Sequence, residues 1–106
     1  MSRIDQREAA RRDLIAHFVY LAENAGLDVA DRFLAQAELT FADLTRQPMI
    51  GAPLGLKHPD LAQVRKWSVS DFDNYLVFYV PHTEGVSIVR VLHAASDWRT
   101  LLDLQD

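Results

Sequence analysis

The chain has 106 residues, of which 49% are hydrophobic and 25% charged, and this length and composition indicate one globular domain over residues 1–106 with a single core. Its net charge of −4 disfavours direct binding of nucleic acid, because phosphate contacts rely on clustered lysine and arginine. It contains no cysteine for disulfides or thiolate chemistry, no signal-peptide core at its N-terminus and no apolar run long enough to span a membrane, so we expect a cytoplasmic protein without a membrane partner.

The N-terminal half is predicted to be a short edge strand at residues 2–6 followed by a helical hairpin. Apolar residues at spacings of three and four predict the first helix over residues 8–25, which Gly26 ends. Asp28 is expected to cap a second helix, which must end before Pro48 because proline disfavours helical conformation in the preceding residue. Together with two strand residues, the apolar faces of these helices supply the expected core, namely Phe18, Phe33, Leu34, Phe41, Val77 and Val89.

The C-terminal half is predicted to be strands, because beyond the proline-rich loop at residues 48–59 the apolar period changes from 3.6 to 2. The run from Tyr75 to Val80 is apolar throughout, as in a strand buried on both faces. The element order is β-α-α-β-β-β with a short C-terminal helix. This order indicates an α+β fold in which the hairpin packs on an antiparallel sheet of three to four strands. We expect strands within 61–69, at 75–80 and at 86–93, turns at 71–74 and 82–85, and a helix at 98–102 capped by Ser96 or Asp97.

No pattern of metal ligands or nucleophiles stands out. The four histidines, His17, His58, His82 and His93, lie too far apart in sequence to form a ligand-spaced pair. We expect His58 and His82 to be solvated, and His17 to lie at the edge of the first helix's apolar stripe. Neither a Gly-x-Ser-x-Gly elbow nor a glycine-rich phosphate loop is present, so we expect no metal and no cofactor.

Arg90 and His93, at the end of the last predicted strand, are the residues best suited to chemistry. A histidine acid beside a phosphate-holding arginine suits phosphodiester cleavage. Strand alternation, however, puts these two side chains on opposite faces unless a bulge intervenes. The alternative is structural, and alternation favours it: Arg90 pairs with a carboxylate such as Asp97, and His93 ends the strand with a hydrogen bond.

Two tryptophans, Trp67 and Trp98, have a structural and a functional interpretation. A strand tryptophan is more often part of a core than of a contact surface, and Trp98 is placed to anchor the short C-terminal helix. Either is a contact anchor if it is exposed, since tryptophan is enriched at interface hot spots.

Seven short motifs, in this order and spacing, together resemble the ParE branch of the RelE/ParE toxins of bacterial type II toxin–antitoxin pairs. Each motif is weak alone, but the series covers nearly the whole chain. The motifs are A-A-R-R-D-L at 9–14, F-V-Y-L-A at 18–22, D-V-A-D-R-F at 28–33, T-R-Q-P at 45–48 followed by Gly51, V-R-K-W at 64–67, N-Y-L-V-F-Y at 74–79 and V-S-I-V-R-V-L-H-A-A-S-D at 86–97.

The resemblance implies a toxin that is not an enzyme and that acts by inhibiting DNA gyrase. It also implies a cognate ParD-like antitoxin, encoded alongside, with a DNA-binding part and a flexible C-terminal segment that wraps the toxin. The candidates for target contact are Arg65, Trp67, Tyr75, Arg90, His93 and Trp98.

Two other functions remain open. RelE-like relatives are ribosome-dependent mRNA endoribonucleases, and in that case His93, Arg90 and Arg65 would be the catalytic residues. Tyr75 stands where many nuclease members carry an arginine, which favours the ParE-like interpretation. The third possibility is a degenerate module that binds its antitoxin without toxicity, because the pI of about 5.4 departs from the basic character of many such toxins.

Overall fold

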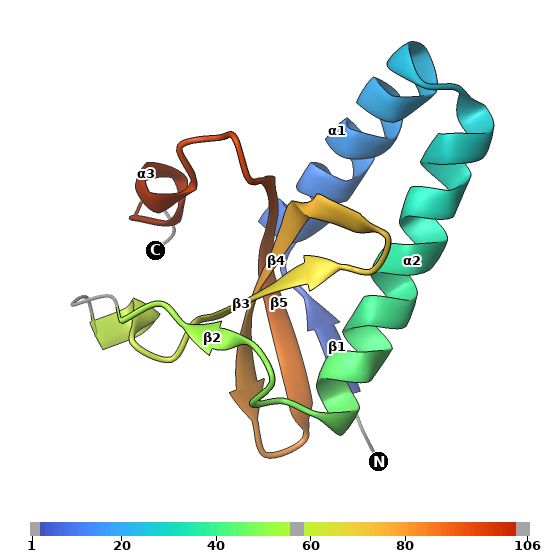
Figure 1. The fold of residues 1–106 in the computed structure, drawn as a ribbon. Helices are drawn as coiled ribbons and strands as arrows, with labels where there is room; N and C mark the ends of the chain where they lie inside the picture. Colours follow the sequence, from blue (N-terminus) through green and yellow to red (C-terminus); the bar gives the residue numbers. More distant parts are fainter. Residues whose placement is uncertain (1–2, 56–58, 104–106) are drawn as a thin grey trace.

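The computed structural model describes residues 3–55 and 59–103, and it places a β-sheet between a helical hairpin and a short third helix (Figure 1). Within these residues no helix is long and apolar enough to cross a membrane. The elements are β1 (Arg3–Gln6), α1 (Glu8–Asn24), α2 (Leu27–Arg46), β2 (Ala52–Pro53), the 3-10 turn η1 (Pro59–Leu61), β3 (Arg65–Val69), β4 (Phe72–His82), β5 (Gly85–His93) and α3 (Trp98–Asp103).

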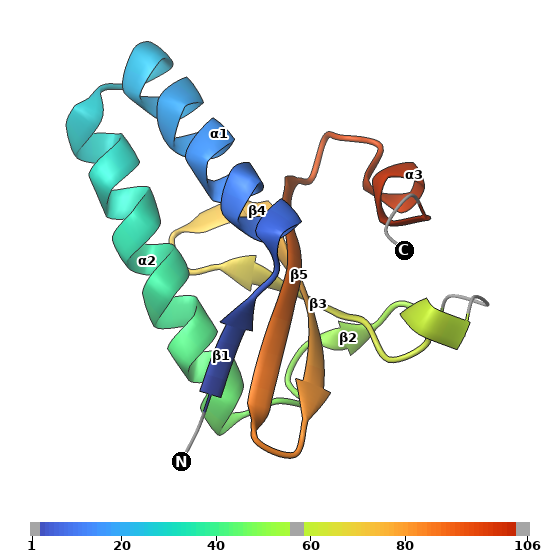
Figure 2. The same cartoon turned by 180° about the vertical axis from the view of Figure 1, so that it is seen from behind.

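The sheet has the strand order β1-β5-β4-β3-β2. The predicted α+β fold is confirmed, with more strands than expected and one parallel pair. The extra strand is β2, which lies inside the segment expected to be loop and is too short to leave a period in the sequence. The parallel pair is β1 with β5, so the sheet is mixed and not wholly antiparallel. The helical hairpin carries the chain from β1 at one edge of the sheet to β2 at the other edge, and β3, β4 and β5 then bring it back to β1 (Figure 2).

Both faces of the sheet are covered. The run from Tyr75 to Val80 contributes side chains to the cores on both faces, as predicted. Alternate β4 residues point to the hairpin and to α3. The helix-side core cluster consists of Ala10, Phe33, Ala37, Phe41, Leu44, Val69, Tyr75, Val77, Tyr79, Val86, Ile88 and Val91. The opposite cluster consists of Leu61, Val64, Leu76, Phe78, Val89, Leu92 and Leu102.

Four of the six predicted core residues are fully buried, and two are not. Phe18 and Leu34 are only partly buried, although Leu34 still packs against the helix-side cluster. In Figures 1 and 2 the closed end of the hairpin rises beyond the sheet. Leu34 lies at the edge of the face of α2 that buries Phe33 and Ala37.

The connection between the helices is tighter than predicted. Gly26, with a φ of 105°, is the N-cap of α2, and Asp28 lies in the first turn, so the predicted Asp28 cap is wrong. Glycine adopts this positive φ at little steric cost, which lets α2 begin directly after α1. The Asp28 carboxylate still lies near the N-terminal end of the helix dipole, where negative charge is favourable.

The two hairpin turns of the sheet are short. The first lies at Ser70–Asp71 and not at 71–74 as predicted, because Asp71 takes a φ of 65° and β4 begins immediately after it. The Ser70 N–H donates to Thr40 Oγ1 at 3.0 Å and thereby ties this turn to α2. At the second turn, a Cβ on Gly85 would collide with the backbone of Arg3, so the close approach of β1 requires glycine there.

Candidate functional site

A β-bulge in the middle of β5 precedes the residues of the candidate site. Phe78 lies opposite Arg90 and Tyr79 opposite Ile88, so Val89 is an extra residue in β5. From Arg90 to His93 the pairing with β4 is regular, so the bulge does not change the alternation between these two residues. Because β1 ends alongside Ile88, no strand in the described residues neighbours the outer edge of β5 beyond that residue.

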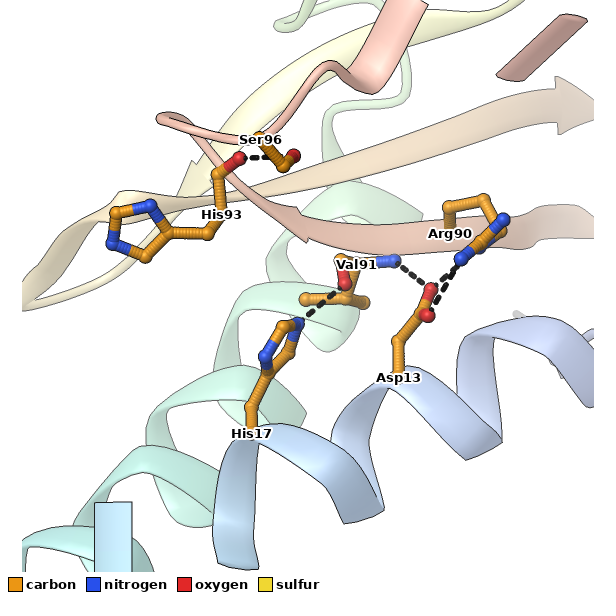
Figure 3. Close-up of polar contacts among 6 residues, drawn as sticks. All are labelled: Asp13, His17, Arg90, Val91, His93 and Ser96. Carbon is orange, nitrogen blue, oxygen red and sulfur yellow. Dashed lines mark hydrogen bonds and ion pairs between the residues drawn. The ribbon is translucent and has the colours of Figure 1, made fainter. Parts of the chain in front are cut away.

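Helix α1 covers this open edge with polar side chains (Figure 3). Asp13 accepts hydrogen bonds from Arg90, with Nε to Oδ2 at 2.7 Å and Nη2 to Oδ1 at 2.8 Å. It also accepts the Val91 N–H at 3.0 Å. The two charged side chains are only 11% and 15% exposed, and the bonds to Asp13 raise the pKa of Arg90. The predicted pairing of Arg90 with a carboxylate is thus correct in kind, but the partner is Asp13 and not Asp97.

His17 lies one turn further along α1 and bonds the same strand residue. Its Nε2 is 2.7 Å from the Val91 carbonyl oxygen. Because a carbonyl only accepts, Nε2 carries the proton and Nδ1 keeps a lone pair. Burial lowers the pKa of His17, and the Val91 bond and Asp13 oppose this shift. Asp13 and His17 together satisfy both backbone polar groups of Val91, as a neighbouring strand would.

A pocket of about 320 Å³ opens beside His17 and is lined by four ring side chains, His17, Tyr20, Tyr75 and His93, which we call the ring pocket. The Tyr75 ring stands edge-to-face at 4.8 Å from His17 and 5.0 Å from His93. His93 Nδ1 accepts the Ala95 N–H at 3.0 Å, so a neutral His93 ring carries its proton on Nε2. Burial and then the nearby Tyr20 raise the pKa of Tyr75. The pocket therefore presents aromatic faces, phenol groups and two imidazoles.

His93 also ends β5 as predicted. Its carbonyl oxygen accepts bonds from the Ser96 N–H at 3.0 Å and from Ser96 Oγ at 2.6 Å (Figure 3). These bonds turn the chain away from the sheet toward α3.

Two other candidate residues, Arg65 and Trp67, lie on β3, near the edge of the sheet opposite to β1. Arg65 donates through Nη1 to the carbonyl oxygens of Gly51 at 2.6 Å and Met49 at 3.2 Å. Trp67 is 38% exposed and lines a groove between β3 and the C-terminal end of α2. Two adjoining hollows of about 370 and 300 Å³ form this groove, and both include Asp43 and Trp67. We call it the Trp67 groove.

Trp98 lies on the opposite face of the sheet and anchors α3 there, as predicted. Its ring lies 5.3 Å from Phe78, with Lys66 Nζ at 5.1 Å and Arg99 Cζ at 4.6 Å from its centroid. Both cations lie within the range of cation–π attraction. The cationic side chains of Lys66 and Arg99 therefore contact the Trp98 ring.

The structure does not gather the six candidate residues into one site. Only Tyr75 and His93 share a pocket. Arg65 lies opposite Tyr79, four residues from Tyr75 along β4, a span of about 13 Å. The three candidates for nuclease chemistry, His93, Arg90 and Arg65, thus have separate surroundings. In the described part of the chain, no three histidine, aspartate or glutamate side chains converge as a metal site requires, and His58 lies outside that part.

Sequence reasoning missed Asp13, His17 and Tyr20 as site residues. A signal was present, because Asp13 and His17 are polar, one helical turn apart, and on the side of α1 that carries buried Ala10. A polar pair at this spacing on an inward face indicates a buried polar contact with another element.

Comparisons with known proteins agree with this fold. The family model described as "ParE toxin of type II toxin-antitoxin system, parDE" matches residues 4–98. The chain is also similar to a chain in the solved structure of the chromosomal ParDE TA system from P. aeruginosa, with 16% sequence identity and a TM-score of 0.70. That alignment covers 88% of this chain and 96% of the other. At this identity the likeness shows the fold alone. No curated protein sequence matches the chain.

Proposed function

This chain belongs to the ParE toxin family of type II toxin–antitoxin systems, and on that premise we propose that it inhibits DNA gyrase and is neutralised by a cognate antitoxin. The observation that carries the proposal is the family match over residues 4–98. We further propose that residues 1–106 are one toxin domain acting in the cytoplasm.

The surroundings of the cationic residues support inhibition by binding and not by catalysis. The Arg90 guanidinium is bound by Asp13, and Arg65 is bound by two backbone carbonyl groups. A nuclease needs such groups available to hold a phosphate beside a general acid. The opposite face of the sheet is filled by an apolar cluster that includes Leu76 and Phe78. Apolar side chains there supply neither charge nor hydrogen bonds to a phosphodiester.

We propose the ring pocket as the contact with gyrase. Tyr20 is 59% exposed and stands at the rim, whereas Tyr75 is 7% exposed and forms the floor. Tyrosine and histidine rings offer both apolar area and a polar tip, which suits a protein contact. This assigns target contact to two of the six candidates, Tyr75 and His93.

We propose the Trp67 groove as the antitoxin site. β2 pairs with Arg65 and Lys66, and no strand in the described part of the chain neighbours the remaining edge of β3. Trp67 and Ile50 are 38% and 41% exposed and line this groove. An extended antitoxin segment with apolar side chains would add a strand to the edge and bury these two residues.

The gyrase proposal is tested with purified components. We expect the chain to block supercoiling of relaxed plasmid by gyrase and to leave cleaved DNA, and we expect Tyr20→Ala and His93→Ala to weaken this effect. His82→Ala, in the exposed β4–β5 turn, is the matched control and should inhibit normally. Ribosome-dependent cleavage of mRNA, lost in His93→Ala, would establish the endoribonuclease alternative instead. Antitoxin binding without either activity would identify a degenerate module.

The antitoxin proposal is tested by co-expression with the neighbouring open reading frame. A partner present at 100 times its dissociation constant adds about 2.7 kcal/mol to the free energy of unfolding, so the melting temperature should rise by several degrees. Trp67→Ala should reduce this rise, while Leu39→Ala, an exposed leucine on the outer face of α2, should not. A chain that co-purifies with no partner and shows no shift in melting would contradict the proposal.

A further inference from the structure

The outer face of α1 is apolar although it points to solvent. Ile15 is 64% exposed and Val19 is 47% exposed, while Asp13 on the inner face is buried. Arg12, Ala16, Val19 and Glu23 follow one another at spacings of four, three and four, so they lie in one line along this outer face. Such a line is the pattern of a helix that packs against a second helix.

This line is complementary to a second copy of itself that runs in the opposite direction. Its apolar centre, Ala16 and Val19, is flanked by a cation at Arg12 and an anion at Glu23, each four residues from the nearer central residue. When a second α1 is laid antiparallel, Arg12 of each copy meets Glu23 of the other, and Val19 meets Ala16. Ile15 then lies beside Val19 of the second copy.

We propose that two copies of this chain associate through the outer faces of α1, antiparallel about a two-fold axis between Ala16 and Val19. The small side chain of Ala16 lets the two helices approach closely. Forming the two ion pairs between the copies costs little stability within each copy. Arg12 gives up only the exposed Arg12–Glu8 pair, whose side chains are 74% and 78% accessible. Glu23 makes no ion pair with any side chain in residues 3–55 or 59–103.

The shape of the molecule leaves this face accessible. In Figures 1 and 2 the hairpin lies along one side of the molecule and its closed end projects beyond the sheet. One pair of helices buries less than the about 1,200 Å² of a standard stable interface. The dimer is therefore a reversible one whose population rises with protein concentration.

Sedimentation velocity over a concentration series tests the apolar centre. We expect wild-type chain to shift from monomer to dimer with concentration, and Val19→Asp to remain monomeric with an unchanged melting temperature. Leu39→Asp is the matched control, because Leu39 is 57% exposed on the other helix, and it should dimerise like wild type. A wild-type chain that stays monomeric at its highest soluble concentration overturns the proposal. A dimer unaffected by Val19→Asp overturns it as well.

Charge reversal tests the antiparallel arrangement. Arg12→Glu and Glu23→Arg each turn both ion pairs into like-charge contacts, so each variant alone should dimerise about tenfold more weakly. Mixed together, the two variants restore opposite charges at both contacts and should form a heterodimer as tight as the wild-type dimer. Failure of the mixture to associate overturns the antiparallel pairing. If wild type alone is monomeric and Val19→Asp instead loses the antitoxin, the face belongs to the antitoxin and the dimer proposal is wrong.

Discussion

The two helices of the hairpin attach to the same sheet in different ways. α2 buries six residues, of which five are apolar, whereas α1 buries only Ala10 and Asp13. α2 is held by apolar packing that does not depend on direction. α1 is held by directional bonds from Asp13 and His17 to β5 together with the partly buried Leu14 and Leu21, while Ile15 and Val19 face solvent.

The two helices also border different candidate sites, because α1 lines the ring pocket and the C-terminal end of α2 lines the Trp67 groove. Apolar packing tolerates changes that keep volume, whereas a bidentate ion pair fixes one geometry. Leu14 and Leu21 of α1 pack against the helix-side core, whereas Ile15 and Val19 are exposed and available for contacts with other molecules. His17 and Tyr20 of the ring pocket also come from α1.

The largest expected loss is at the α2 interface. Phe33 is fully buried and packs against Tyr75 and Phe72, so Phe33→Ala should lower the free energy of unfolding by about 3–5 kcal/mol. Phe18→Ala on α1 is the matched comparison and should cost about half as much, because Phe18 is only partly buried. Chemical denaturation of both variants measures the difference, and equal losses would contradict the distinction between the helices.

Removing one buried charge tests the polar attachment of α1. Asp13→Ala leaves the Arg90 guanidinium and the Val91 N–H without their acceptor, and we expect a loss of about 3 kcal/mol. Because the penalty comes from the unpaired charge, Asp13→Ala with Arg90→Met should be more stable than Asp13→Ala alone. A double variant that is no better would show that packing, and not charge, holds this position.

Acid should loosen the same attachment. Burial holds the pKa of His17 below the 6.5 of an unfolded chain, so the unfolded state binds a proton first as pH falls. This contribution to stability is complete above pH 6.5 and is lost as pH falls below that value toward the folded-state pKa. Denaturation at a series of pH values should show less of this loss in His17→Gln than in wild type. The groups that face His17 and enter the same balance are Asp13, His93 and Arg90.

Local rules in the sequence predicted most of the fold. Apolar period, Gly26 and Pro48 defined the two helices within a residue or two, and the unbroken apolar run from Tyr75 predicted a strand buried on both faces. Such features depend on neighbours in the chain. The site depends on residues far apart: Asp13 and Arg90 are 77 positions from each other.

Two features of β5, its bulge and the partner of Arg90, leave no local signal in the sequence. No glycine or proline marks Val89, since the bulge arises from how β5 pairs with β4 while its other edge meets α1. The partner of Arg90 was missed for another reason: Asp13 lies 77 positions away on α1, so the sequence suggested only a carboxylate such as Asp97. Similarly, the turn at Asp71 is held by Thr40 of α2, a contact that a scan of turn residues does not reveal.

The smallest loss of stability is expected at the Arg12–Glu8 ion pair on the surface of α1. The Arg12–Glu8 pair and the Arg90–Asp13 pair have the same nitrogen–oxygen distance of 2.7 Å. They differ in burial, because the first pair is about three-quarters exposed and the second is almost enclosed. Water screens the exposed pair, so Arg12→Ala should cost less than about 0.5 kcal/mol in monomeric protein. Denaturation of Arg12→Ala beside Asp13→Ala, at a concentration too low for association, measures both. Similar losses from the two changes would mean that distance, and not burial, sets the strength of these two ion pairs.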